Sequence, residues 1–216
     1  TGTISVGAVA KDILYLGITS PSFIYKYNGI RFDKVWDFGL ETITSMAGDS
    51  NGKLYVGTSP NARLYQLDGI AFKEVANLSD ITISALKIIN NTLYIGTSPG
   101  GKVYKLSDAG LEFIASTGQS SINSIDGFLN EVFFGTSPNG RIYRYSNELM
   151  EIVHNDSDSD ILSIGLYLPP TTTTTGVGTA SNFILAGTSP HGRILKSNVK
   201  AQSFYKTFQS VPHKVQ

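Results

Sequence analysis

The chain has 216 residues, with 17 Lys plus Arg balanced by 17 Asp plus Glu, so its formal net charge is zero. General binding to nucleic acid or to membrane surfaces needs a basic excess, which this composition lacks. Cysteine is absent, which excludes disulfides, zinc–thiolate sites and thiol nucleophiles. No apolar run approaches the roughly 18 residues that cross a bilayer. We therefore expect a globular protein with no cofactor, no metal, no nucleic-acid partner and no membrane insertion.

One phrase occurs five times, beginning at Gly17, Gly57, Gly96, Gly135 and Gly187, and in the fourth copy it reads Gly-Thr-Ser-Pro-Asn-Gly-Arg-Ile-Tyr. Four copies are 40, 39 and 39 residues apart, and the last gap is 52 because a Thr-rich segment interrupts it. Recurrence at about 40 residues indicates a repeat architecture. We expect one domain over 1–216, with units at about 1–39, 40–79, 80–118, 119–157 and 158–210, and an insertion at 169–181.

Each repeat is predicted to contain four short strands, since Val, Ile, Tyr and Phe favour a pleated surface and no stretch has a sustained helical period. The first strand is an Ile-rich phrase, the second ends at the recurring glycine, and the third comes after the Ser-Pro turn. The fourth begins near an aromatic residue or Met. The expected first strands are Thr3–Val6, Ile43–Met46, Ile83–Leu86, Ile122–Ile125 and Ile161–Ile164, and the fourth begin near Phe32, Phe72, Phe113, Met150 and Phe204.

The connections contain residues typical of tight turns. Ser-Pro-Asn fits a type I turn with Pro at its second position, followed by a glycine that can adopt a positive φ. Asn28-Gly29 and Asp68-Gly69 predict two-residue type I′ turns between the third and fourth strands. Asn51-Gly52 and Asn90-Asn91 predict similar turns between the first and second strands.

Four antiparallel strands in each of five repeats predict an all-β fold, a five-bladed β-propeller, because sheets that stand side by side cover each other's faces. The alternative is a β-solenoid or a stacked sandwich, and the hairpin turns favour antiparallel meanders over the parallel coils of a solenoid. Small residues recur in the first strand, which we expect to be innermost, where space is limited: Ser5, Ser45, Ala85, Ser124 and Ser163.

The Gly-Thr-Ser-Pro-x-Gly-Arg/Lys phrase resembles the hairpins of bacterial and phage-type propeller repeats. The number of repeats resembles the five-bladed lectin propellers of the tachylectin-2 type, although the lectin repeat motif itself is absent. The resemblance implies a propeller fold and leaves the function open.

The alternation of strands puts the Ser-Pro turns on the same face as the loops that precede the first strands. Polar residues that gather there are candidates for ligand binding: Thr58, Arg63, Thr97, Lys102, Thr136, Arg141, Thr188 and Arg193, with Glu41, Asp80 and Asp160 in the neighbouring loops. The competing interpretation is structural. The threonines would then build the turns, and the Arg and Lys side chains would cover neighbouring Tyr rings.

The sequence favours a non-enzymatic recognition module, a part of a larger extracellular or virion-surface assembly such as a tail, fibre or filament. Its partners would be other protein subunits or surface glycans. A multivalent lectin is the first alternative. A glycoside hydrolase that uses Glu41, Asp80 or Asp160 is the second, because that reaction needs two carboxyl groups at a defined separation. The acidic run Asn155–Asp160 suggests calcium by its alternating carboxylates, but a solvated loop explains it better.

Overall fold

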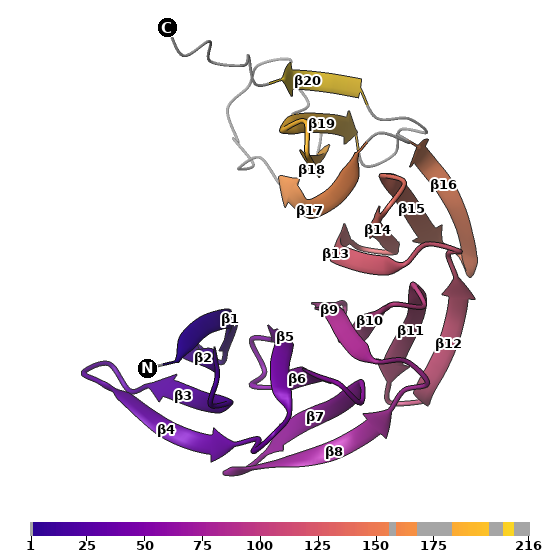
Figure 1. The fold of residues 1–216 in the computed structure, drawn as a ribbon. Helices are drawn as coiled ribbons and strands as arrows, with labels where there is room; N and C mark the ends of the chain where they lie inside the picture. Colours follow the sequence, from indigo (N-terminus) through magenta and orange to yellow (C-terminus); the bar gives the residue numbers. More distant parts are fainter. Residues whose placement is uncertain (1, 156–158, 168–182, 199–204, 210–216) are drawn as a thin grey trace, which may run out of the picture. The chain divides into compact units, whose positions relative to one another are not determined.

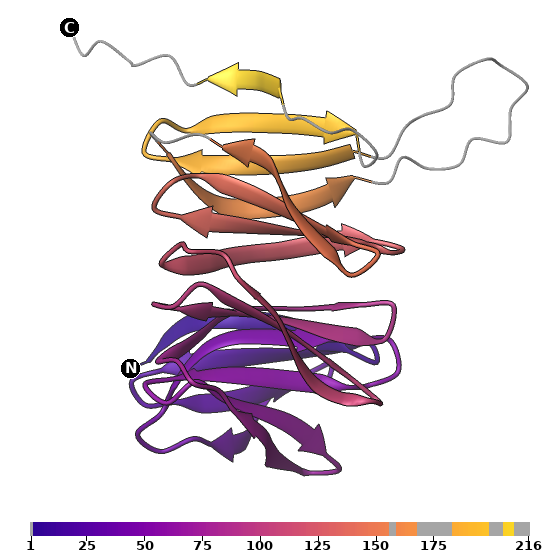
Figure 2. The same cartoon turned by 90° about the vertical axis from the view of Figure 1, so that its right-hand side faces the viewer.

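Five four-stranded antiparallel sheets make up the structure, a computed structural model that describes residues 2–155, 159–167, 183–198 and 205–209. Each sheet is a meander in which strands adjacent in the chain are hydrogen-bonded neighbours (Figure 1 and Figure 2). No helix occurs among the described residues, and so none of them forms a helix that could cross a membrane. The predicted all-β fold with four antiparallel strands in each repeat is confirmed.

The strands divide evenly among the sheets. Sheet 1 contains β1 (Thr3–Ala10), β2 (Ile13–Thr19), β3 (Phe23–Tyr27) and β4 (Phe32–Asp37). Sheet 2 contains β5 (Thr42–Gly48), β6 (Leu54–Ser59), β7 (Arg63–Asp68) and β8 (Ala71–Asn77), and sheet 3 contains β9 (Thr82–Ile89), β10 (Thr92–Ser98), β11 (Lys102–Ser107) and β12 (Gly110–Ser116). Sheet 4 contains β13 (Ser121–Phe128), β14 (Glu131–Ser137), β15 (Arg141–Ser146) and β16 (Leu149–Asn155), and sheet 5 contains β17 (Asp160–Tyr167), β18 (Phe183–Ser189), β19 (Arg193–Asn198) and β20 (Tyr205–Gln209).

The chain forms two compact units, residues 1–122 and residues 123–216. In the first unit, the core is made of aliphatic side chains from the first two strands of neighbouring sheets, among them Ile43, Leu54, Ile83 and Leu93. In the second unit, Phe133, Ile142, Ile161 and Ile184 form the equivalent cluster. The second strands β6 and β14 are buried on both faces, whereas in β18 buried and partly exposed residues alternate. The expected insertion at 169–181 lies outside the described residues.

The first strands of sheets 1, 2, 3 and 5 each contain a β-bulge, at which the pairing with the second strand shifts by one residue. Ile43 pairs with Thr58 and Ser45 with Gly57, so no residue of β6 is paired with Thr44, which lies in the bulge between them. In sheet 1 the same arrangement leaves Ser5 in the bulge and places Val6 opposite Gly17. Ser5 is thus equivalent to Thr44 and not to Ser45, which corrects the expected series of small residues. The phrase Thr3–Val6 therefore aligns with Ile43–Met46 only after a shift of one residue, with Ile4 in the place of Ile43 and Val6 in the place of Ser45.

The turn after the second strand differs from the prediction at the proline. The peptide bond before Pro60, and before each of the other four prolines of the phrase, is cis, so the expected type I turn with a trans proline does not form. The glycine that follows has the expected positive φ, for example +53° at Gly101, and Ala62 has φ +44° at the same position in sheet 2. The type I′ turn at Asn90-Asn91 is confirmed, since both residues have positive φ.

The other predicted two-residue turns are shifted or longer than expected. In sheet 2 the two connecting residues are Gly69 and Ile70, one position later than Asp68-Gly69, and Asn51-Gly52 lies in a five-residue loop between Gly48 and Leu54. In sheet 1 a four-residue loop joins Tyr27 to Phe32.

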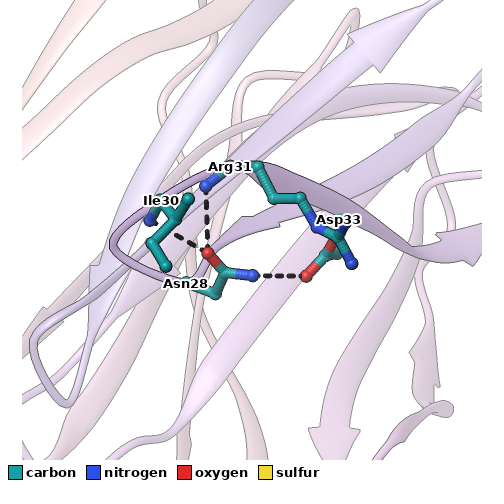
Figure 3. Close-up of polar contacts among 4 residues, drawn as sticks. All are labelled: Asn28, Ile30, Arg31 and Asp33. Carbon is teal, nitrogen blue, oxygen red and sulfur yellow. Dashed lines mark hydrogen bonds and ion pairs between the residues drawn. The ribbon is translucent and has the colours of Figure 1, made fainter.

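The loop of sheet 1 is held by the side chain of Asn28 (Figure 3). Its Oδ1 accepts the backbone N–H groups of Ile30 and Arg31, both at 3.0 Å, and its Nδ2 donates to Asp33 Oδ2 at 2.7 Å. Arg31 binds the other oxygen of the Asp33 carboxylate at 2.8 Å. These side-chain bonds add to a backbone bond from the Asn28 N–H to the carbonyl of Arg31 at 3.1 Å. The loop has four residues, so the prediction of a two-residue type I′ turn here was wrong.

Candidate functional site

A polar network joins the Ser-Pro turn of sheet 2 to the loop that precedes β5. The hydroxyl of Thr58 donates to Glu41 Oε2 at 2.9 Å, and the hydroxyl of Tyr65 donates to the same oxygen at 3.0 Å. Arg63 Nη1 lies 2.9 Å from Glu41 Oε1, so both carboxylate oxygens are engaged. The side chain of Glu41 is 12% exposed and that of Arg63 is 37% exposed. The Glu41 carboxylate is therefore held by three donors, from Thr58, Tyr65 and Arg63. The guanidinium of Arg63 keeps part of its surface in solvent.

Burial and neighbouring charges perturb two groups of this network. The pKa of Tyr65 is raised, chiefly because burial disfavours the phenolate, and the hydrogen bond to the Glu41 carboxylate adds to the effect. The pKa of Arg63 is raised by its hydrogen bond with Tyr65 and by the negative charge of Glu41. Both shifts favour the neutral phenol of Tyr65 and the charged guanidinium of Arg63.

Sheet 3 repeats the link between threonine and carboxylate with different neighbours. Thr97 donates to Asp80 Oδ2 at 2.7 Å, and the backbone N–H of Gly100 donates to the same oxygen at 3.0 Å. Lys102 differs from Arg63 in its partner, because its Nζ donates to the carbonyl of Ser79 at 2.6 Å and not to the neighbouring carboxylate of Asp80. The shorter Asp80 side chain thus takes a turn amide as its second donor, where the longer Glu41 reaches an arginine.

The second unit contains a reduced form of the network. In sheet 4 the hydroxyl of Thr136 donates to the carbonyl of Arg141 at 3.0 Å, and the Arg141 side chain donates to Asn155 Oδ1 at 3.2 Å. In sheet 5 the backbone N–H of Arg193 donates to Thr188 Oγ1 at 3.1 Å. Asp160 lies in β17 opposite Ser189. Three residues of the acidic run, 156–158, lie outside the described part of the chain.

The expected shared face is present in sheets 2 and 3, where loop acids meet turn threonines. The threonines themselves are buried: Thr58, Thr97 and Thr136 have no exposed surface. Their hydroxyls are bonded to the chain itself, whereas Arg63 and Lys102 keep part of their surface in solvent. Arg63 and Arg141 approach the hydroxyl of the neighbouring Tyr and not its ring, unlike the expected stacking. Ligand binding by these residues stays a prediction.

Sequence reasoning missed the groups that join neighbouring sheets. Ser84 Oγ in the bulge of β9 donates to the carbonyl of Ile122 at 2.6 Å, and Thr44 Oγ1 donates to the carbonyl of Ile83 at 2.7 Å. A sequence signal for this contact existed, since an isoleucine stands 26 residues after each of the first four repeated glycines. Nothing in a single sequence says that the two positions touch.

Comparisons with known proteins identify the fold alone. No family model and no curated protein matches the chain. Among solved structures, it superimposes on the extracellular domain of a putative hybrid two-component system from B. thetaiotaomicron with a TM-score of 0.70 and 19% identity over 99% of the chain. It also superimposes on a structure of a nidogen/laminin complex, at TM-score 0.66 and 11% identity over 99% of the chain.

A third match decides the architecture: the WD40 β-propeller domain of Doa1, at TM-score 0.66 and 11% identity over 94% of the chain. The repeated sheets have the β-propeller fold. The chain spans 28% of the bacterial protein, 81% of the matched chain in the nidogen/laminin complex and 67% of the Doa1 propeller. At these identities the propeller likeness carries the fold alone, and function has to be argued from the site.

Proposed function

We propose that this chain is a five-bladed propeller that acts as a non-enzymatic recognition module and binds other protein subunits of a larger extracellular or virion-surface assembly. The proposal is supported by similarity to an extracellular domain and to a structure of a nidogen/laminin complex. It is also supported by the internal bonding of Glu41 and Asp80, which commits both carboxylates to neighbouring donors.

Exposed isoleucines at the connections between third and fourth strands carry the proposal. Ile30 is 90% exposed in the loop between β3 and β4, and Ile70 is 92% exposed between β7 and β8. Turns and short loops are normally built from polar residues and glycine, so two isoleucines at equivalent places in adjacent repeats present apolar surface that a protein partner can bury. The buried centre of a protein interface is apolar, which favours a protein partner over a sugar at these positions.

The test compares three baits in co-purification from the natural source, with quantitative mass spectrometry, and adds a glycan array. The baits are the wild-type chain, the double variant Ile30→Asp/Ile70→Asp, and Lys73→Asp as a control at an exposed position of β8. We expect a protein partner that the wild type and the control retain and that the double variant loses by roughly tenfold or more, equivalent to about 1.4 kcal/mol. A glycan signal that falls on Arg63→Ala, with no partner sensitive to the isoleucines, would establish the lectin alternative instead.

A further inference from the structure

Aromatic side chains join the outer strands of sheets 1 and 2. Trp36 of β4 packs against Phe72 of β8 with ring centroids 5.9 Å apart. The ring of Phe38 lies 5.5 Å from Phe72 and 5.0 Å from Tyr65. Phe72 is only 7% exposed. At this interface, aromatic residues of the preceding sheet therefore cover the outer strand of the next one.

The outer strand of sheet 3 has the same register but not the same cover. Leu111 of β12 pairs with Leu106 of β11. In the same way, Phe72 of β8 pairs with Leu67 of β7 in sheet 2. Leu111 is 43% exposed, however, whereas Phe72 is buried. The interface between sheets 2 and 3 thus leaves in solvent the position that is covered between sheets 1 and 2.

The difference lies in one residue of the preceding sheet. Trp36 pairs with Ile24 in sheet 1, beside the register shift between β3 and β4. Ala76 pairs with Leu64 at the equivalent place in sheet 2. Sheet 2 therefore offers a methyl group to Leu111 where sheet 1 offers an indole ring to its neighbour.

A second apolar side chain lies beside Leu111 on the same face of β12. Phe113 is two residues further along the strand, so it points to the same side, and it is 53% exposed. Its ring is in edge contact with that of Tyr104, at 5.4 Å. Tyr104 and Leu106 pack in the hydrophobic cluster that includes Tyr55 of sheet 2. Leu111 and Phe113, which we call the β12 face, are therefore turned toward sheet 2.

A lysine without an acidic partner borders the same interface. Lys73 of β8 pairs with Gln66, and Gln66 pairs with Tyr55, so the three side chains lie on the face of sheet 2 that is turned toward sheet 3. The equivalent residues of sheet 3, Lys105 and Glu112, form an ion pair at 3.3 Å. In sheet 2 the acid is replaced by this lysine, which is exposed and forms no ion pair with any residue that the structure describes.

We propose that the β12 face and Lys73 bind a protein partner that presents a Trp or Phe side chain next to an Asp or Glu. The aromatic ring of the partner packs on the β12 face as Trp36 packs on β8, and the partner's carboxylate pairs with Lys73. This surface is separate from the contact proposed for Ile30 and Ile70, and the inference does not depend on that contact.

Selection from a displayed library of random peptides tests this chemistry. The library is depleted on the variant Leu111→Asp/Phe113→Asp and then selected on the wild-type protein. We expect the enriched peptides to contain Trp or Phe beside Asp or Glu, and to bind Lys73→Asp at least about tenfold more weakly than the wild type. Glu112→Gln is the matched control, because Glu112 lies on the opposite face of β12, and it should keep the affinity. Enriched peptides that lack the aromatic residue or the acid, or no enrichment at all, would overturn the proposal.

A further variant supplies the missing ring from within the chain. Ala76→Trp places an indole at sheet 2 where Trp36 stands in sheet 1, so we expect it to remain folded and to bind the selected peptides at least about tenfold more weakly. Wild-type affinity in folded Ala76→Trp would show that the peptide ring does not occupy this place. Lys73→Asp should lose the peptides yet retain the partner that depends on Ile30 and Ile70, which distinguishes failure of this surface from failure of the proposed function.

Discussion

Thr58 donates its hydroxyl hydrogen to Glu41 Oε2 over 2.9 Å and so fastens the turn after β6 to the loop before β5. The two residues are 17 positions apart in the chain, and Thr97 and Asp80 make the same contact in the next sheet at the same separation. The repeated threonine of the Gly-Thr-Ser-Pro phrase is therefore explained by the architecture of the blade, and its repetition alone does not indicate a ligand site.

The first prediction concerns this threonine. Thr58→Val keeps the shape of the side chain but leaves the largely buried Glu41 carboxylate without one of its donors, so we expect a loss of about 1–3 kcal/mol in the free energy of unfolding. Urea denaturation measures the change. Thr42→Val is the control, because Thr42 is an exposed residue of β5 in the same sheet. A loss at Thr58 no larger than that at Thr42 would contradict the structural role.

The second prediction concerns alkaline pH. Burial raises the pKa of Tyr55, with further contributions from the charges of Asp49 and Asp108. Because the folded state disfavours the phenolate, Tyr55 favours folding fully below its unfolded pKa, near 10, and loses this contribution as the pH rises through the folded value. We therefore expect the free energy of unfolding to fall above about pH 10, and to fall less steeply in Tyr55→Phe.

Stability measured between neutral pH and pH 11 checks this expectation, with Tyr27→Phe as a control at an exposed tyrosine. The opposite result, a steeper alkaline loss in Tyr55→Phe than in the wild type, would mean that the buried hydroxyl stabilises the fold by a route other than its titration.

The sequence predicts the repeats, the strand order and the pairing of turns with loop acids because these depend on local patterns. Alternating Val, Ile and Tyr residues specify strands, and a constant spacing specifies equivalent blades. The exact registers were not predictable. Whether Ser5 or Val6 faces Gly17 depends on the bulge, and the loop at Asn28 depends on a side-chain contact with Asp33. Both features are decided by contacts that a local pattern does not contain.

The candidate site was predictable to the same degree. Alternating strand direction was enough to put Glu41 near Thr58 and Asp80 near Thr97. It could not show that the hydroxyls point inward to these acids, because the burial of Thr58 and Thr97 depends on the neighbouring loop.

The third prediction separates backbone strain from steric conflict at two glycines. Gly101 has φ +53°, and an added Cβ would overlap the carbonyl oxygen of Gln119 and lie 2.8 Å from Thr117 Oγ1. Gly69 has φ +64° with no atom within 4 Å of an added Cβ. Gly69→Ala should therefore cost only the left-handed conformation, about 1–2 kcal/mol, whereas Gly101→Ala should cost clearly more.

Ala62 extends this comparison, because it adopts φ +44° at the position equivalent to Gly101. Its side chain is buried in the core of the first unit. Ala62→Gly therefore relieves the strain of the positive φ but loses the packing of the methyl group, and we expect the free energy of unfolding to change by no more than about 1 kcal/mol. Thermal unfolding of the three variants side by side measures the order. If Gly69→Ala is as damaging as Gly101→Ala, the overlap with Gln119 has no energetic consequence.

The fourth prediction concerns the close contact between Gly96 of β10 and Ile122 of β13. Gly96→Ala puts a methyl group where Ile122 already lies, so the two sheets must separate or Ile122 must leave its position, at a cost of about 1–3 kcal/mol or more. Gly165→Ala in β17 is the control, because an added Cβ there meets no atom within 4 Å and alanine restricts the unfolded chain. Denaturant titrations of the two variants measure the difference, and a cost of Gly96→Ala no larger than that of Gly165→Ala would contradict the close contact between Gly96 and Ile122.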